Sequence, residues 1–163
     1  MTLIIIISIL ILVIIIWWFF FRVSIPEIPP LTVDENDPLM IEAIKTAKEH
    51  INDFIKLFEE NKGNSQVKVS FKTSTGRTEF LWAEVLQIKD LNIEVRLLTP
   101  PVTHNGQVNR IQTFQLNEVV DWAVFSENGK VKGGHTMRVM FKIAKAKWGQ
   151  LPDKLKAEEL KYE

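Results

Sequence analysis

One stretch of the chain, Val119 to Phe141, concentrates the residue types that could do chemistry. It reads VVDWAVFSENGKVKGGHTMRVMF and places Asp121, His135 and Arg138 around the glycine pair Gly133-Gly134. A hydroxyl, an imidazole and a carboxylate in one hydrogen-bonded chain would activate a nucleophile. Clustered His and Asp side chains would suit a metal ion, and a glycine-rich loop leading into a helix would cradle a phosphate.

The rest of the sequence argues against each of these chemistries. There is no G-x-S-x-G elbow, and a cysteine nucleophile is excluded because the chain has no Cys. The three histidines, His50, His104 and His135, show no metal-ligand spacing. We expect Gly133-Gly134 to lead into a strand, which would not form a phosphate cradle. The sequence therefore predicts no catalytic residue, no metal and no cofactor.

The alternation of side chains predicts where these polar groups point. If Val120 and Trp122 face inward, Asp121 faces outward, and a strand from Thr136 to Phe141 would put His135 and Arg138 on opposite faces. Under this reading the stretch is a hairpin with polar residues on its edges. The remaining alternative is a polar ligand groove, whose candidate ligand- or partner-binding residues are Glu79, Trp82, Asp121, Trp122, Thr136 and Arg138.

One amphipathic helix and a series of strands are predicted to position these residues. Asp37 is suited to cap a helix that starts at Pro38, and apolar side chains at spacings of three and four continue to Phe58 before Gly63 ends it. Beyond Gln66 the period changes to two. The expected strands are 66–72, 78–89, 91–98, 110–116, 119–125, 130–132 and 136–141, with a two-residue hairpin turn within Glu127-Asn128-Gly129-Lys130.

These elements predict an α+β fold. The helix packs on a twisted, mostly antiparallel sheet of five or six strands, because each has an apolar face that it cannot bury alone. Strand 78–89 is apolar on both faces and is expected to be covered on both sides. The folded domain covers 37–141, and the Lys/Glu-rich tail 142–163 is expected to fray, with some helix after Pro152.

The amino-terminal segment predicts a membrane anchor within residues 1–22. The run from Leu3 to Phe21 contains one polar side chain, Ser8. As a helix it would be about 28 Å long, close to the ~30 Å hydrocarbon core of a bilayer. Trp17 and Trp18 lie where aromatic side chains anchor at the headgroups. The sequence therefore predicts a single-pass membrane protein whose partner is the lipid bilayer.

A cleaved signal peptide is the competing interpretation of this segment. It would need a basic start, a shorter apolar run and a small-residue cleavage site, and none of these is present. Arg22 is the one basic residue close to the run, and it favours a cytoplasmic position for the soluble domain. Residues 23–36, with prolines at 26, 29 and 30, read as an extended spacer.

The charge distribution excludes one class of partner. The formal net charge is zero, with acidic residues concentrated before Glu60 and basic residues after Lys130. A nucleic-acid-binding domain would be basic, with a concentrated stripe of Lys and Arg. We therefore expect no nucleic-acid partner.

Four motifs together carry a resemblance to a known family. DPLMIEAIKTA, VKVSF, TEFLWAEV and VVDWAV…NGKVKGGHTMRVM resemble, in order and spacing, the YegJ-like bacterial domain, domain of unknown function twenty-three fourteen. The match runs from Asp37 to about Met140 and implies a small α+β domain without assigned catalytic residues. The chain departs from the family pattern at His135, where the family has Tyr, and at Thr99-Pro100-Pro101, where it has N-x-P.

Three functions are compatible with these features. The first is a non-enzymatic binding module, held at a membrane, that recruits a protein or peptide through a sheet face or strand edge. The second is a small enzyme or ligand sensor that uses a groove around Glu79, Asp121 and Arg138. The third is a toxin-neutralising accessory protein.

Overall fold

The computed structural model describes residues 36–61, 64–72, 78–98 and 111–162. They belong to a compact unit, Leu31–Glu163. The predicted anchor and spacer, Gly63 and the segments 73–77 and 99–110 lie outside the described residues. Within the described part, no helix combines the length and apolarity needed to cross a bilayer.

The predicted amphipathic helix is present but is divided in two. α2 (Pro38–Glu49) begins as expected, with the Asp37 carboxylate accepting a hydrogen bond from the Leu39 amide at 2.8 Å. His50, at φ −97° and ψ 18°, separates it from α3 (Ile51–Glu60), so the prediction of one continuous helix is wrong. The break lets both halves follow the twisted sheet, since Ala47 from α2 and Phe54 from α3 are buried in the same core.

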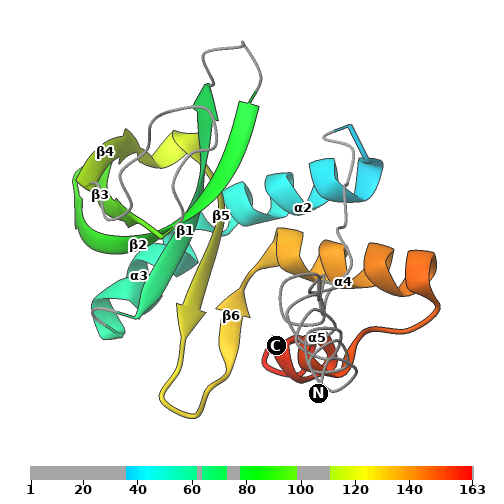
Figure 1. Cartoon of the computed structure of the whole chain (residues 1–163). Helices are drawn as coiled ribbons and strands as arrows, with labels where there is room; N and C mark the ends of the chain where they lie inside the picture. The colour runs from blue at the N-terminus through cyan, green and yellow to red at the C-terminus, as the bar shows by residue number, and fades with distance from the viewer. Residues whose placement is uncertain (1–35, 62–63, 73–77, 99–110, 163) are drawn as a thin grey trace, which may run out of the picture. The chain divides into compact units, whose positions relative to one another are not determined.

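Six strands form one antiparallel sheet, as predicted (Figure 1). Its order is β4-β3-β2-β1-β5-β6, and each neighbouring pair is antiparallel. The strands are β1 (Ser65–Lys72), β2 (Thr78–Lys89), β3 (Asn92–Leu97), β4 (Ile111–Gln115), β5 (Val119–Phe125) and β6 (Val131–Gly133). A short 3₁₀ turn, η1 (Leu116–Glu118), joins β4 to β5.

The β5–β6 hairpin has a longer loop than predicted. The Ser126 amide donates to the Lys130 carbonyl at 2.8 Å, and the Gly129 amide donates to the Ser126 carbonyl at 2.9 Å. Three residues, Glu127 to Gly129, therefore form the loop instead of two. Gly129 takes φ +79°, which is the left-handed residue of a type I turn followed by a bulge.

The largest error of the sequence-based prediction concerns residues 136–141, which form a helix and not a strand. α4 (His135–Trp148) begins directly after the glycine pair. Period-two alternation over six residues cannot be told from one face of a helix, and Met137, Phe141 and Ala144 are also spaced by four and three. These three side chains pack in one cluster with the buried Leu151.

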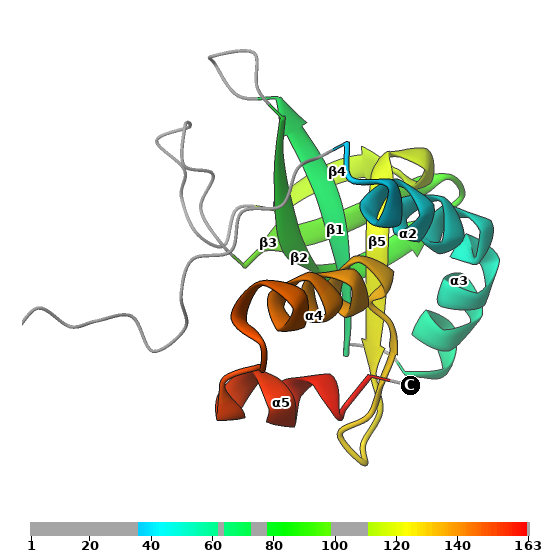
Figure 2. The ribbon, with the colours of Figure 1, turned by 90° about the vertical axis from the view of Figure 1, so that its right-hand side faces the viewer.

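The carboxyl-terminal tail does not fray as expected. It forms α5 (Asp153–Glu159), which the sequence had indicated after Pro152, and is held at both ends (Figure 2). Leu151 is only 2% exposed, and the Tyr162 ring lies edge-on to Phe141 at 5.5 Å between centroids. The Val131 amide of β6 donates to the Lys161 carbonyl at 2.7 Å, so the tail extends the sheet by one bridge.

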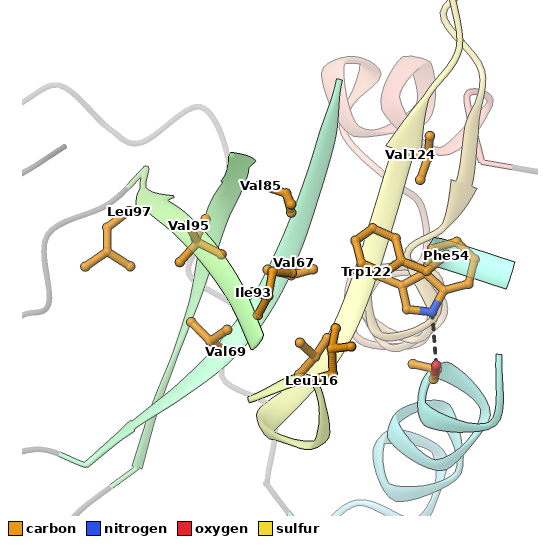
Figure 3. Packing of buried hydrophobic residues seen from close by; sticks show 13 residues of the cluster. Phe54, Val67, Val69, Val85, Ile93, Val95, Leu97, Leu116, Trp122 and Val124 are labelled. Carbon is orange, nitrogen blue, oxygen red and sulfur yellow. Dashed lines mark hydrogen bonds between the residues drawn. The ribbon is translucent and has the colours of Figure 1, made fainter. Parts of the chain in front are cut away.

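The main core lies between α2–α3 and one face of the sheet (Figure 3). Trp122 is 4% exposed, as predicted for a core residue, and its indole Nε1 donates to the Ala47 carbonyl at 3.0 Å. Its ring also stacks on Phe54 at 5.6 Å. This pairing ties β5 to both helices.

The opposite face of the sheet is less well covered. On β2, Leu81, Ala83 and Val85 are buried in or near the core, whereas Phe80 and Trp82 are half-buried on the other side. The expectation that β2 is covered on both sides therefore holds for the first face, and the second face is only partly covered. Among the described residues, α4 packs against β5, and no helix packs extensively on this face over β2 and β3.

Candidate functional site

Asp121 belongs to β5, and its side chain lies at the amino terminus of α4. Its Oδ1 accepts hydrogen bonds from the amides of Trp122 (2.8 Å) and His135 (3.1 Å). Its Oδ2 accepts from the Thr136 amide (2.7 Å) and the Thr136 hydroxyl (2.6 Å). The side chain is 0% exposed, so the prediction that Asp121 faces outward is wrong. The carboxylate is the cap of a helix whose own N-cap residue, Gly134, has no side chain to supply one.

The glycine pair turns the chain from β6 into this helix. Gly133 and Gly134 take φ +83° and +63°, in the left-handed region that favours glycine. The Gly134 amide donates to the Trp122 carbonyl at 2.6 Å. The pair therefore leads into a helix after all, but the His135 and Thr136 amides that could cradle a phosphate already bind Asp121.

A hydrogen-bonded chain extends from Asp121 to β1. The Thr136 hydroxyl donates to Asp121 and accepts from Lys68 Nζ at 3.2 Å. Lys68 Nζ also lies 6.0 Å from the Phe80 ring centroid and 5.9 Å from that of Trp82, a cation–π arrangement. Burial lowers the pKa of Lys68, and the nearby Asp121 charge partly offsets this. Lys68 therefore links the buried cap to the open face of the sheet.

His135 sits at the first position of α4 among other rings. Its ring stacks on His50 at 6.1 Å between centroids and lies edge-on to Trp122 at 5.5 Å. Its Nε2 is buried without a hydrogen-bond partner among the described residues. Burial lowers the pKa of His135, the charges of Arg138 and His50 lower it further, and Asp121 raises it.

This environment predicts acid-sensitive stability. Below the ordinary histidine pKa of 6.5 the unfolded chain takes up a proton that the folded chain resists at His135. The free energy of unfolding should therefore fall as the pH drops from about 7 to about 5. Substituting His135→Phe keeps an aromatic ring but cannot take up this proton. We expect urea unfolding at the two pH values to show a smaller loss in this variant than in the parent chain. An equal loss in both would contradict the role given to His135.

Arg138 holds the backbone of the glycine turn. Its Nε and Nη2 donate to the Gly133 carbonyl at 3.2 and 3.0 Å. Because hydrogen bonds from a charged group contribute about 1.5–3 kcal/mol, Arg138→Ala should lower the free energy of unfolding by about that amount. Lys142→Ala, an exposed position on the same helix, should change it by less than about 0.5 kcal/mol. Thermal or urea unfolding of both variants checks this, and equal stabilities would show that Arg138 is not structural.

The structure brings most of the sequence-predicted site residues together. Asp121, Trp122, Thr136 and Arg138 meet at the start of α4, and Trp82 joins them through Lys68. Glu79 lies farther along β2, opposite Phe71 of β1. The ligand- or partner-binding role of these six residues stays a prediction.

Several members of this cluster were not predicted from the sequence. Lys68 read as a solvent-facing residue of an alternating strand, and His50 as one polar position of a continuous helix. Tyr162 lay in the tail that was expected to fray. A Cβ on Gly134 would lie 2.2 Å from Cε1 of the Tyr162 ring. The Tyr162 ring therefore packs directly against the glycine turn.

A groove of about 370 Å³ lies beside this cluster. Tyr162 lies in the wall of this groove. Burial raises the pKa of its phenol to about 12, with smaller contributions from the charges of Glu158 and Asp121, so the phenol keeps its proton near neutral pH. The groove is lined by Gln66, Trp82, Ala123, Phe125, Met137, Glu158 and Tyr162. Its aromatic walls and few polar groups are typical of a ligand- or partner-binding groove.

The described residues offer no obvious metal centre. Within 36–61, 64–72, 78–98 and 111–162, no group of three or more His, Cys, Asp or Glu side chains could hold an ion.

Comparison with known proteins gives one match. A family model described as an uncharacterized protein conserved in bacteria, DUF2314, matches residues 37–148. This confirms the resemblance seen in the four sequence motifs, and the match continues to the last residue of α4. No curated protein and no solved structure matches.

Proposed function

This chain belongs to the DUF2314 family of bacterial proteins, and we propose that it is a membrane-anchored, non-enzymatic binding module. In this proposal Leu3 to Phe21 holds the protein in a bilayer, and the open face of the sheet beside α4 and α5 receives a protein or peptide. The polar cluster under that face has a structural role.

One observation carries the binding role, namely that the polar groups of the cluster are already used internally. Asp121 accepts four hydrogen bonds and is 0% exposed, and the Thr136 hydroxyl both donates and accepts within the domain. A general base or ligand-binding carboxylate would need an accessible lone pair. The nearby groove, by contrast, presents half-buried Trp82, Phe125 and Tyr162 side chains to a partner.

The anchor rests on sequence and on element length. A helix from Leu3 to Phe21 would span about 28 Å with one hydroxyl inside it, and the backbone polar groups of its interior would be satisfied within the helix. Arg22 favours a cytoplasmic position for the domain. The domain would then be tethered to the membrane by the spacer 23–36.

Membrane extraction tests the anchor. The full chain is expressed in bacterial cells, and its membrane fraction is washed with alkaline carbonate beside a variant that lacks residues 1–21. We expect the full chain to stay in the pellet with its complete mass and the shortened variant to be released. Release of the full chain, or a mass that lacks the leading segment, would refute the anchor.

Site-specific photocrosslinking tests the binding face. A photoreactive amino acid replaces Gln66 in the groove or, as the control, Lys89 at the far end of β2. The proposal predicts a discrete heavier adduct from position 66 that is absent from position 89. The same pattern at both positions, or no adduct at either, would contradict binding at the groove beside α4.

A further inference from the structure

One edge of the sheet is paired with the carboxyl-terminal tail, and the other edge is formed by β4. At one edge β6 is covered, because the Val131 amide donates to the Lys161 carbonyl and Val131 bridges Tyr162. At the other edge β4 pairs with β3, and no second strand pairs with β4 among the described residues (Figure 1). The carboxyl-terminal tail therefore protects only one edge.

Within the described residues, β4 lacks three of the devices that prevent an edge strand from pairing. Proteins commonly place Lys, Pro or a bulge on such edges. The residues of β4, IQTFQ, include no charge and no proline, and the register with β3 runs without a shift. Two large apolar side chains are exposed at its end of the sheet, Ile111 at 54% and Leu98 at 42%. These features suit a surface that is covered by another strand.

We propose that β4 pairs antiparallel with β4 of a second copy of this chain, about a twofold axis at Thr113, to form a continuous sheet across two molecules. In this register Ile111 opposes Gln115 of the second copy, and Gln112 opposes Phe114. All five residues pair, and directly opposed side chains share a face of the sheet. The half-buried Phe114, which packs on the main core, then continues that face across the axis.

The register is electrostatically self-compatible. A twofold axis at Thr113 places this central residue directly opposite its own copy, so a charge there would be repelled by itself. β4 carries none, and the exposed hydroxyl of Thr113 faces an identical hydroxyl. Cross-strand Thr–Thr pairs are favourable in sheets.

Single cysteines test the register directly, because the chain contains no Cys of its own. Opposed residues of an antiparallel pair have Cα atoms about 4.5–5.5 Å apart, within the range that a disulfide bridges. Full-length chain in detergent micelles with Thr113→Cys should therefore form a disulfide-linked dimer under mild oxidation. Ile111→Cys is the matched control, since its two copies would lie about 14 Å apart along the paired strands.

Charge substitutions provide an independent arm. Thr113→Lys and Thr113→Glu should each lose the dimer in sedimentation of the full chain in micelles, and an equal mixture of the two should regain it. Equal cross-linking at positions 111 and 113, or an oligomeric state unchanged in both charge variants, would overturn the proposal. The sheet residues that line the groove beside α4 belong to β1, β2 and β5, and β3 separates these strands from β4, so photocrosslinking at Gln66 can succeed or fail independently.

Discussion

Replacing Asp121 with alanine is expected to lower the free energy of unfolding by roughly 3–5 kcal/mol, as when one partner of a buried charged network is removed. The substitution leaves the amides of Trp122, His135 and Thr136 without their acceptor, in a place that water does not reach. It also removes the negative charge that partly offsets the effect of burial on the pKa of Lys68. Domains are stable by about 5–15 kcal/mol, so this loss would be a large part of the total. Urea unfolding of the full chain in micelles measures it.

Substitutions at Thr136 serve as graded controls. Thr136→Val keeps the backbone amide on Asp121 but removes the hydroxyl bonds, and should cost about 1–3 kcal/mol. Thr136→Ser keeps the hydroxyl and should cost less than Thr136→Val. If Asp121→Ala does not fold, Asp121→Asn provides the test. It keeps one acceptor oxygen, and its free energy of unfolding should still be lower than that of the parent chain. A loss under about 0.5 kcal/mol for Asp121→Ala would place the residue among ordinary surface positions and refute its capping role.

Replacing Gly133 with alanine is expected to cost roughly 3 kcal/mol or more through two separate effects. At φ +83° an alanine is strained, which contributes about 1–2 kcal/mol. Its Cβ would also lie 2.3 Å from the Trp122 carbonyl oxygen and 2.4 Å from the Trp122 ring. The Trp122 residue cannot move easily, because its ring is packed on Phe54 and its indole N–H is hydrogen-bonded to the Ala47 carbonyl.

Gly129 provides the matched control for this substitution. It has a similar φ of +79°, but a Cβ there would meet nothing within 4 Å. Gly129→Ala should therefore show the backbone strain alone, and the difference between the two variants isolates the clash with Trp122. Equal melting temperatures for the two would mean that Gly133 is required only for its backbone conformation.

Local patterns in the sequence predict much of this fold. Asp37-Pro38 marks the start of α2, and the alternation of Val67 and Val69 marks β1, because capping and strand periodicity act over a few residues. β2 and β5 have their predicted bounds. The break at His50 is not visible in the same way, since it depends on how Phe54 meets Trp122 from another part of the chain.

The sequence predicts which residues belong to the candidate site but not how their side chains contact one another. Asp121 and Thr136 are separated by 15 positions and meet only because Gly133-Gly134 turns the chain into α4. Once this stretch is misread as a strand, Asp121 points to solvent and its capping role is hidden. A carboxylate placed before a glycine pair and a Thr is the signal that could have indicated a cap supplied from another strand.

The motif positions that carried the family resemblance thereby gain a physical explanation. Trp122 ties β5 to α2, Gly133 fits under the Trp122 ring, and Arg138 holds the Gly133 carbonyl. Asp121 and Thr136 secure the first turn of α4. These residues define how α4 is attached to β5, and we propose that the sheet face beside them receives a partner.

Hydrogen exchange of the Thr136 amide tests this central claim most directly. First-turn amides of a helix have no acceptor within the helix and ordinarily exchange fast. Because this amide donates to the buried Asp121 carboxylate, it should exchange in the full chain as slowly as the amides of β5, and Asp121→Asn should speed it. Fast exchange in the parent chain, unchanged by the substitution, would contradict the account.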